Sequence, residues 1–303
     1  MAPVTHQHEP MRSLRVRAGL AARILRDRRT LHVPPGHHYS PIPSPEDVAR
    51  ADRRASEAGP DLPGLDLRPA EQVRLLDRLL PLYAELPDWS TPGAGRFTYA
   101  NDWFTWADAI GYALMLRHAG PRRVVEVGAG WSSALALDVD ERFLGGTTTF
   151  TFVDPAPERL RSLVAADELA GRLVAAPVQE VPLALFETLG PGDILFVDSS
   201  HVLKAGSDVQ HLVDEVYPHL APGVLLHVHD VFWPFEYPAS WLATGCSVNE
   251  AYAIRALLQG STAFEVVLWN DFLARFHRDW LAANMPLMLA GDFPTGGIWL
   301  RRR

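Results

Sequence analysis

The stretch VVEVGAGWSS, residues 124–133, joins a β-branched apolar run to a glycine-rich turn and then to serines that can cap a helix. A short strand, a tight turn and a helix form the opening unit of a parallel α/β sheet. Gly128 and Gly130 let the backbone of the turn approach a ligand closely, and a helix N-terminus follows. The pattern is not GxGxxG, because Ser133 stands where the third glycine would be. The stretch therefore predicts a ligand-binding turn after the first strand of a sheet.

The strand-and-helix pattern continues on the C-terminal side of this turn. Apolar, strand-like runs at 147–155, 172–178, 193–198 and 224–230 alternate with segments of helical periodicity. Each run is nearly continuous, which is typical of strands that are buried on both faces of a parallel sheet. Two later runs, at 264–270 and 296–302, predict a closing antiparallel hairpin. The sequence therefore predicts an α/β fold with a doubly wound, Rossmann-like sheet of seven mostly parallel strands and an antiparallel C-terminal hairpin.

The residues before the sheet have a mixed character, and they predict a division of the chain. We expect residues 1–95 to form a helical N-terminal extension and residues 96–303 to form the catalytic domain. The extension carries a basic helix at 11–29, a proline-rich arm at 33–45 and a leucine-patterned packing helix at 67–86. We predict that the arm closes over the substrate mouth, and an ordinary surface arm is the alternative.

Composition excludes several classes of function. The formal charge of −8 and the pI near 5.8 argue against general nucleic-acid binding, which needs a basic surface. No apolar run approaches 18 residues, so we expect no stable membrane insertion. Cys246 is the only cysteine, so an internal disulfide cannot form. Arginines interrupt the N-terminal apolar residues, so we expect no signal peptide and a cytoplasmic protein. Homo-oligomer formation is left open.

Two carboxylates close the first two predicted strands. Glu126 lies inside the end of the first strand, where a carboxylate is costly unless it meets a donor. Asp154 ends the second strand, where it is suitably placed for ribose hydroxyls. A tight turn with no ligand is the alternative, but two acids beside a glycine turn favour a nucleoside ligand. Glu126 would repel a pyrophosphate, and it therefore favours a ligand that carries a positive charge.

A second pair of acids closes two later strands, in the stretches VDSSHVLKAG (197–206) and LLHVHDVFWP (225–234). Asp198 and Asp230 lie 32 positions apart, which is about what one βαβ unit requires. If the two strands are neighbours about 4.8 Å apart, both carboxylates reach one small volume and repel each other unless a cation or a proton intervenes. We predict a metal site, with His229 as a further ligand. The alternative is an acid that caps a loop beside histidines on an ordinary surface.

At this point the sequence resembles a known family. VVEVGAGWSS, followed by Asp154 and Asp198 after later strands, is similar to the class I S-adenosylmethionine-dependent methyltransferases over about residues 97–303. The resemblance implies that Asp154 binds the ribose of the cofactor and that Val178 or Gln179 lies beside its adenine. The whole cofactor-binding set that it implies is Glu126, Gly128, Gly130, Ser132, Asp154 and Gln179.

The second pair of acids resembles the metal-dependent O-methyltransferases, such as the catechol and macrolide-sugar enzymes. That resemblance implies a divalent ion held by Asp198, His229 and Asp230. A histidine ligand where the family has an oxygen ligand favours Mn²⁺ or Fe²⁺ over Mg²⁺. Where the catechol enzymes have a lysine base this chain has His201, which we predict as the catalytic base beside Asp198. Lys204, the only lysine of the chain, is the second candidate.

The resemblance implies methyl transfer to a hydroxyl of a small molecule, such as a sugar, a phenolic or another natural product in a biosynthetic pathway. We expect the aromatic stretches at 101–106 and 232–241 to build the substrate mouth. Two alternatives stay open. One is a metal-dependent oxidative enzyme that resembles cephalosporin hydroxylase on the same fold, and the other is a non-catalytic module that binds S-adenosylmethionine.

Overall fold

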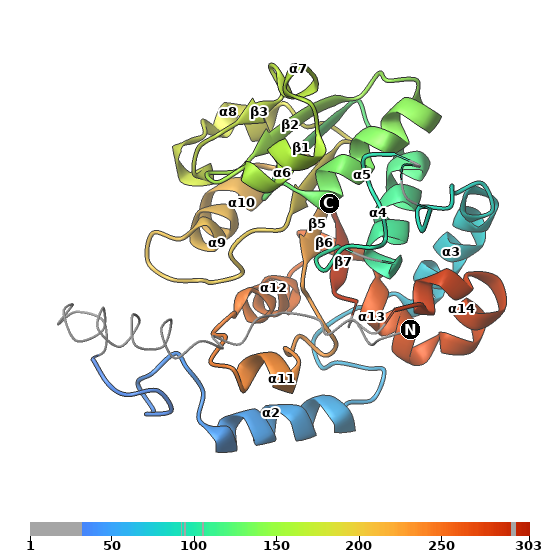
Figure 1. Cartoon of the computed structure of the whole chain (residues 1–303). Coiled ribbons are helices and arrows are strands. Elements are labelled where there is room, and N and C mark those ends of the chain that lie inside the picture. The colour runs from blue at the N-terminus through green and yellow to red at the C-terminus, as the bar shows by residue number, and fades with distance from the viewer. Residues whose placement is uncertain (1–31, 92, 94, 105, 292–294) are drawn as a thin grey trace. The chain divides into compact units, whose positions relative to one another are not determined.

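The computed structural model describes residues 32–91, 93, 95–104, 106–291 and 295–303 (Figure 1). The basic helix predicted at 11–29 lies outside the described residues. Contacts between residues divide the chain into two compact units. The larger unit consists of residues 58–236 and 248–303, and the described part of the smaller unit consists of residues 32–57 and 237–247. The predicted division near residue 95 stays a prediction.

The smaller unit is built around two helices that contact each other, α2 (Pro45–Glu57) and α11 (Ala239–Leu242). The proline-rich segment before α2 turns back on itself, because the amide of Gly36 donates to the carbonyl of Ile42 at 3.0 Å. Gly36 has a φ of +79°, which favours glycine at this turn.

The larger unit contains a seven-stranded sheet with the order β3-β2-β1-β4-β5-β7-β6. The strands are β1 (Arg123–Val127), β2 (Thr149–Val153), β3 (Leu173–Val174), β4 (Ile194–Val197), β5 (Leu225–His229), β6 (Phe264–Trp269) and β7 (Gly297–Arg302). Strands β1 to β5 pair in parallel, whereas β7 is antiparallel to both β5 and β6. The predicted mostly parallel sheet with a C-terminal antiparallel hairpin is therefore confirmed.

In the larger unit two helices precede the first strand, and further helices and helical turns connect the strands (Figure 1). They are α3 (Pro69–Tyr83), α4 (Trp106–Ala119), α5 (Trp131–Val139), η1 (Asp140–Leu144), α6 (Glu158–Leu163), α7 (Ala166–Leu169), η2 (Val178–Glu180), α8 (Leu183–Glu187), α9 (Asp208–His211), η3 (Leu212–Val216), α10 (Tyr217–His219), α12 (Glu250–Leu258), α13 (Asn270–Phe276), α14 (Arg278–Asn284) and η4 (Pro286–Leu289). The segments α13, α14 and η4 fill the long connection between β6 and β7. Among the described residues no helix is both long and apolar enough to span a membrane.

The packing of α3 and α4 follows from their apolar patterns. The leucines of α3 bury one stripe, which includes Leu75 and Leu79, and Gln72 joins this helix to β6 by accepting from the amide of Trp269 at 2.9 Å. Helix α4 is buried along most of its length. Its Tyr112 stacks on Phe196 of β4, with 4.3 Å between the ring centroids, and so ties α4 to the middle of the sheet.

The strand register brings four strand ends to one edge of the sheet. Val127 of β1 lies opposite both Val153 of β2 and Val197 of β4, and Val197 lies opposite Val228 of β5. The chain order reverses between β1 and β4, and this switch point is where a doubly wound sheet binds its ligand. The predicted site residues that directly follow these strands therefore share one edge.

Candidate functional site

A cavity of about 340 Å³ opens at the switch point, at the carboxyl ends of β1, β2 and β4. It is lined by Val127, Gly128, Val153, Asp154, Pro155, Pro177, Val178, Gln179, Asp198, Ser199, Ser200 and Asp208. The structure thus brings together Gly128, Asp154 and Gln179 of the predicted cofactor set. Glu126, Gly130 and Ser132 are not among the described residues that line the cavity.

Gly128 is required by the packing of the protein itself. Its φ is +82°, and a Cβ built on it would lie 1.7 Å from the carbonyl oxygen of Asp198. The amide of Gly128 donates to Val153 and the amide of Asp198 donates to Val127, each at 2.9 Å, so the turn after β1 is fixed between its two neighbours. Only glycine tolerates both the left-handed backbone and the close approach of Asp198.

Glu126 is fully buried, and it holds the start of α5. Its Oε1 accepts from the hydroxyls of Ser132 at 2.6 Å and Ser133 at 2.8 Å. Its Oε2 has no hydrogen-bond partner among the described residues. Burial raises the pKa of Glu126 to about 8, although both serines act in the opposite direction. A ligand contact of Glu126 stays a prediction.

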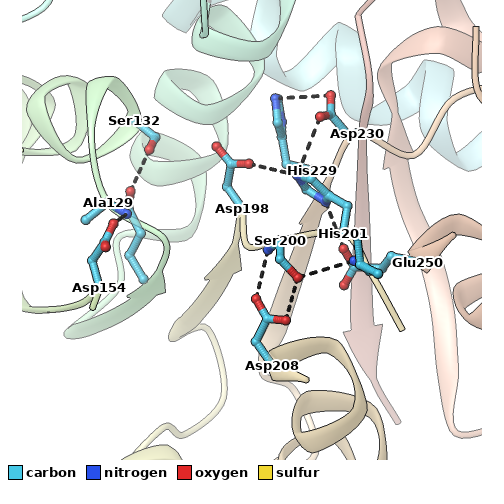
Figure 2. A network of polar contacts seen from close by, with 12 residues as sticks. Ala129, Ser132, Asp154, Asp198, Ser200, His201, Asp208, His229, Asp230 and Glu250 are labelled. Carbon is cyan, nitrogen blue, oxygen red and sulfur yellow. Dashed lines mark hydrogen bonds and ion pairs between the residues drawn. The ribbon is translucent and has the colours of Figure 1, made fainter. Parts of the chain in front are cut away.

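Asp154 and Gln179 hold the walls of the cavity. Asp154 accepts from the amide of Ala129 at 2.9 Å and from the amide of Ala156 at 2.7 Å, so it ties the turn after β1 to the turn after β2 (Figure 2). The side chain of Gln179 donates to the carbonyl of Gly206 at 2.9 Å. These bonds give the cavity its shape independently of any ligand.

Beside the cavity lies a cluster of two acids and two histidines, Asp198, His201, His229 and Asp230 (Figure 2). The Nε2 atom of His201 is 3.2 Å from Oδ1 of Asp198 and 3.5 Å from Oδ2 of Asp230. Nε2 of His229 is 3.7 Å from Oδ1 of Asp230. The acids are partly exposed, whereas the histidines are nearly buried. Because Asp198 lines the cavity and also contacts His201, it connects the cavity to this acid–histidine cluster.

The backbone turns sharply at two members of the cluster. His201 has a φ of 56° and Asp230 a φ of 54°, which lie in the left-handed region and cost a non-glycine residue about 1 kcal/mol or more each. The turn at Asp230 begins directly after β5, and it is held by a hydrogen bond from its amide to the carbonyl of Gly296. This turn lets His229 and Asp230 reach the same volume, which a continuing strand would not allow.

The acids and histidines of the cluster stabilise one another in their charged forms. Burial alone would raise the pKa of Asp198, but His229 and the hydrogen bond from His201 outweigh it and lower this pKa to about 2. Burial would lower the pKa of His201, but its bonds to Asp198 and Glu250 raise it well above its usual value. The pKa of His229 is also raised against burial, by Asp198 and Asp230. At neutral pH an ionised Asp198 therefore faces a protonated His201.

Sequence reasoning missed Glu250, the fully buried first residue of α12. Its Oε2 lies 2.9 Å from Nδ1 of His201, the nitrogen on the far side of the ring from Asp198. The amides of Asn249 and Glu250 also donate to the carbonyl of His201 at 2.8 and 3.1 Å. Asn249 accepts in addition from the amide of Leu203 at 2.6 Å. The start of α12 thus holds both the ring and the backbone of His201.

Asp208 was missed by sequence reasoning as well. Asp208 accepts from the amide and the hydroxyl of Ser200 at 2.8 and 2.6 Å, and it lines the cavity. Lys204 is exposed in a loop between β4 and α9, and its amide donates to the hydroxyl of Ser207 at 3.1 Å. Residues 202–206 form no helix, and the role of Lys204 as the second candidate base stays a prediction.

The predicted aromatic substrate mouth is corrected in part. Phe232, Trp233 and Phe235 are buried, and two of them, Trp233 and Phe235, pack their rings against Trp269. These side chains therefore belong to the core, because an apolar run after a strand can fold inward as readily as it can line a pocket.

The other predicted part of the mouth does reach the surface. Trp103 is 56% exposed, and the guanidinium of Arg159 lies 3.9 Å from its ring centroid.

A metal ion does not fit the cluster as it is arranged. Among the described residues, no group of three or more histidine, cysteine or acidic side chains is placed to hold a metal. Nε2 of His201 lies within 3.5 Å of both Asp198 and Asp230, so the imidazole takes the position between the carboxylates that a cation would need. The predicted ligation by Asp198, His229 and Asp230 stays a prediction.

The chain is similar to several known proteins. Residues 125–231 match a family model described as a methyltransferase domain. An uncharacterized protein of Archaeoglobus fulgidus is 34% identical over 163 residues, which cover 52% of this chain and 73% of that protein.

Solved structures are also similar to the chain. The crystal structure of the S-adenosylhomocysteine-bound methyltransferase PaMTH1 of Podospora anserina is 15% identical and covers 86% of this chain and 97% of that chain, with a TM-score of 0.41. The structure of the O-methyltransferase TomG of Streptomyces achromogenes, which is involved in tomaymycin synthesis and was solved with S-adenosylmethionine, is 15% identical and covers 75% and 89%, with a TM-score of 0.39.

Proposed function

Because the chain belongs to the class I S-adenosylmethionine-dependent methyltransferase family, we propose that it methylates a hydroxyl group of a small molecule. One observation carries the proposal. Asp198 lines the cavity at the switch point of the sheet and also belongs to the acid–histidine cluster. In that cluster the ring of His201 contacts Asp198 through Nε2 and Glu250 through Nδ1. The cavity suits a nucleoside cofactor, and the cluster suits removal of a proton beside it.

The residues that line the cavity fit the cofactor. Asp154 would face the ribose hydroxyls, and Val178 and Gln179 would lie beside the adenine. When bound, S-adenosylmethionine supplies an electrophilic methyl group on a sulfonium. The carboxylate of Asp198, whose pKa is lowered to about 2, stays ionised at neutral pH and favours a positive charge at its end of the cavity.

His201 is the proposed base, and Glu250 is the residue that positions it. The carboxylate of Glu250 accepts from Nδ1, so Nε2 is the nitrogen that faces Asp198, Asp230 and the cavity side of the cluster. A neutral His201 can take the proton of a hydroxyl at Nε2, and the resulting imidazolium is stabilised by the three carboxylates around it. Because the pKa of His201 is raised, its neutral fraction and the rate of transfer should increase with pH.

The proposed removal of the hydroxyl proton uses only protein groups. A divalent ion at Asp198, His229 and Asp230, as the resemblance implies, would need His201 to leave its place between the carboxylates. The protonated imidazole instead supplies a positive charge that lets two carboxylates share this volume.

Binding of S-adenosylhomocysteine to the full chain, measured by calorimetry, tests the cofactor part of this proposal. We expect one site, and we expect Asp154→Ala to weaken binding about 10-fold or more because a ribose partner is lost. Asp167→Ala, an exposed acid of α7, is the matched control and should bind as the wild type does. The proposal fails if the wild type does not bind or if both variants bind equally well. A screen of hydroxylated acceptors with labelled methyl donor then tests the transfer itself.

A further inference from the structure

A second cavity, of about 410 Å³, lies at the opposite edge of the sheet from the acid–histidine cluster. Pro191 and Gly223, which precede β4 and β5, form part of its wall. Residues of α3, α4, β6 and β7 complete it. Because β4 and β5 run parallel, their amino ends lie at the far edge from Asp198 and Asp230. This far-edge cavity therefore has no part in the proposed methyl transfer.

The far-edge cavity concentrates positive charge. Its charged lining residues are Arg68, Arg74, Arg78, Arg301 and a single carboxylate, Glu71. The chain as a whole has a formal charge of −8, so this local excess runs against the overall charge. Such a concentration is unfavourable without an anion, because like charges repel across a low-dielectric wall.

A second carboxylate, Glu265, does not line the cavity but pairs with two of its arginines and with Arg303. Glu265 pairs with Arg68 at 2.7 Å, with Arg301 at 3.0 Å and with Arg303 at 3.1 Å. Burial would raise the pKa of Glu265, but these arginines outweigh it and lower the pKa. A single negative charge cannot balance three guanidinium groups, so positive charge remains beside the cavity.

The two arginines that α3 contributes to the cavity differ in their ion pairing. Arg74 pairs with Glu71 at 2.7 Å, whereas Arg78 has no carboxylate within ion-pair distance among the described residues. Burial lowers the pKa of His118, and repulsion from Arg78 and Arg301 lowers it further. Two guanidinium groups therefore act on the same histidine, and it lines the same cavity.

Beneath the arginines the cavity has an apolar floor. Leu75, Met115, Leu225 and Val266 line it and are almost fully buried. The pairing of β6 with β7 shifts register between Val266 and Leu268, and the bulged Val267 also lines the cavity. Inorganic phosphate alone would leave this floor exposed, so the shape favours a ligand with an apolar body as well as an anionic group.

We propose that the far-edge cavity binds a small organic phosphate, with the phosphoryl group between Arg78 and Arg301 and the apolar body on the floor. Guanidinium groups stay charged and bind phosphate through two parallel hydrogen bonds. A phosphomonoester carries nearly two negative charges, which matches the unbalanced arginines better than a carboxylate does. The volume lies within the range of about 300–1,000 Å³ that small-molecule sites occupy.

Calorimetry with phenyl phosphate tests this proposal, using the full chain with and without S-adenosylhomocysteine so that the cofactor cavity can be filled independently. We expect one saturable site in both cases, weaker binding of inorganic phosphate and of benzoate, and none of phenol. Inorganic phosphate lacks the apolar body, benzoate carries less negative charge, and phenol carries none at neutral pH. Tighter binding of benzoate would overturn the choice of phosphate.

Matched variants locate the site. Arg78→Gln and Arg301→Gln should each weaken phenyl phosphate binding about 10-fold or more, because each removes a charge-assisted hydrogen bond. Arg161→Gln, an exposed arginine of α6 that lines neither cavity, should bind as the wild type does. Arg78 is exposed, so its replacement should leave the fold intact, which thermal unfolding checks. The proposal is overturned if the wild type shows no saturable binding or if Arg78→Gln matches Arg161→Gln.

Discussion

Glu250→Gln separates a positioning role of Glu250 from a merely structural one. The substitution removes a buried negative charge 2.9 Å from Nδ1 of His201 and keeps the size of the side chain. A hydrogen bond to a charged group contributes about 1.5–3 kcal/mol, and about 1.4 kcal/mol corresponds to a tenfold change in a proton-binding constant. Because Glu250 favours the protonated ring, the titration midpoint of His201 should fall by about one to two pH units.

The assay is a titration of the His201 ring followed by nuclear magnetic resonance, which needs no knowledge of the acceptor. Glu158→Gln removes an exposed acid of α6 and is the matched control, with an unchanged midpoint expected. Binding of S-adenosylhomocysteine checks that the variant is folded. An unchanged or higher midpoint in a folded Glu250→Gln would refute the reasoning, since loss of the carboxylate can only favour the neutral ring.

Three further predictions concern stability and metal binding. The folded-state pKa of Glu126 is about 8 against 4.5 for an exposed glutamate, so the folded protein binds more protons and its free energy of unfolding should fall as pH rises through this range, by on the order of 3 kcal/mol at pH 7. Glu126→Gln should lack this loss in urea unfolding at pH 5, 7 and 8, and a parallel decline in both proteins would contradict it. Gly128→Ala should lower the free energy of unfolding by about 2–4 kcal/mol, because its Cβ meets the carbonyl of Asp198 and its φ is positive; an unchanged urea midpoint would oppose this. His201→Ala should bind Mn²⁺ more tightly than the wild type in calorimetric titration, because it frees the space between Asp198 and Asp230, whereas tighter binding by the wild type would support the metal site implied by resemblance.

The sheet could be predicted because its signals are local. Each buried strand is a short apolar run bounded by turn residues, and alternation with helical segments leaves few topologies open. The convergence of Asp198 and Asp230 followed from the same reasoning, since both directly follow strands that prove to be neighbours. Asp154 could be placed for the same reason, because it ends the second strand at the switch point.

Contacts between distant segments could not be predicted in this way. Glu250 lies 49 positions from His201, and an acid in the first turn of a helix has no feature that distinguishes a buried partner from an ordinary helix start. The burial of Trp233 depends on its packing against β6 and α13, which no local pattern encodes. The glycine turn at Gly128 was expected from the sequence as a place where a ligand comes close, but the neighbour that demands a glycine, the carbonyl of Asp198, appears only in three dimensions.

A crystal structure of the full chain with S-adenosylhomocysteine tests the central claim most directly. We predict that the ligand occupies the cavity at the ends of β1, β2 and β4, with its ribose beside Asp154, its adenine beside Gln179 and its sulfur towards Asp198 and the acid–histidine cluster. Density for the ligand elsewhere, or a sulfur that faces away from His201, would contradict the account.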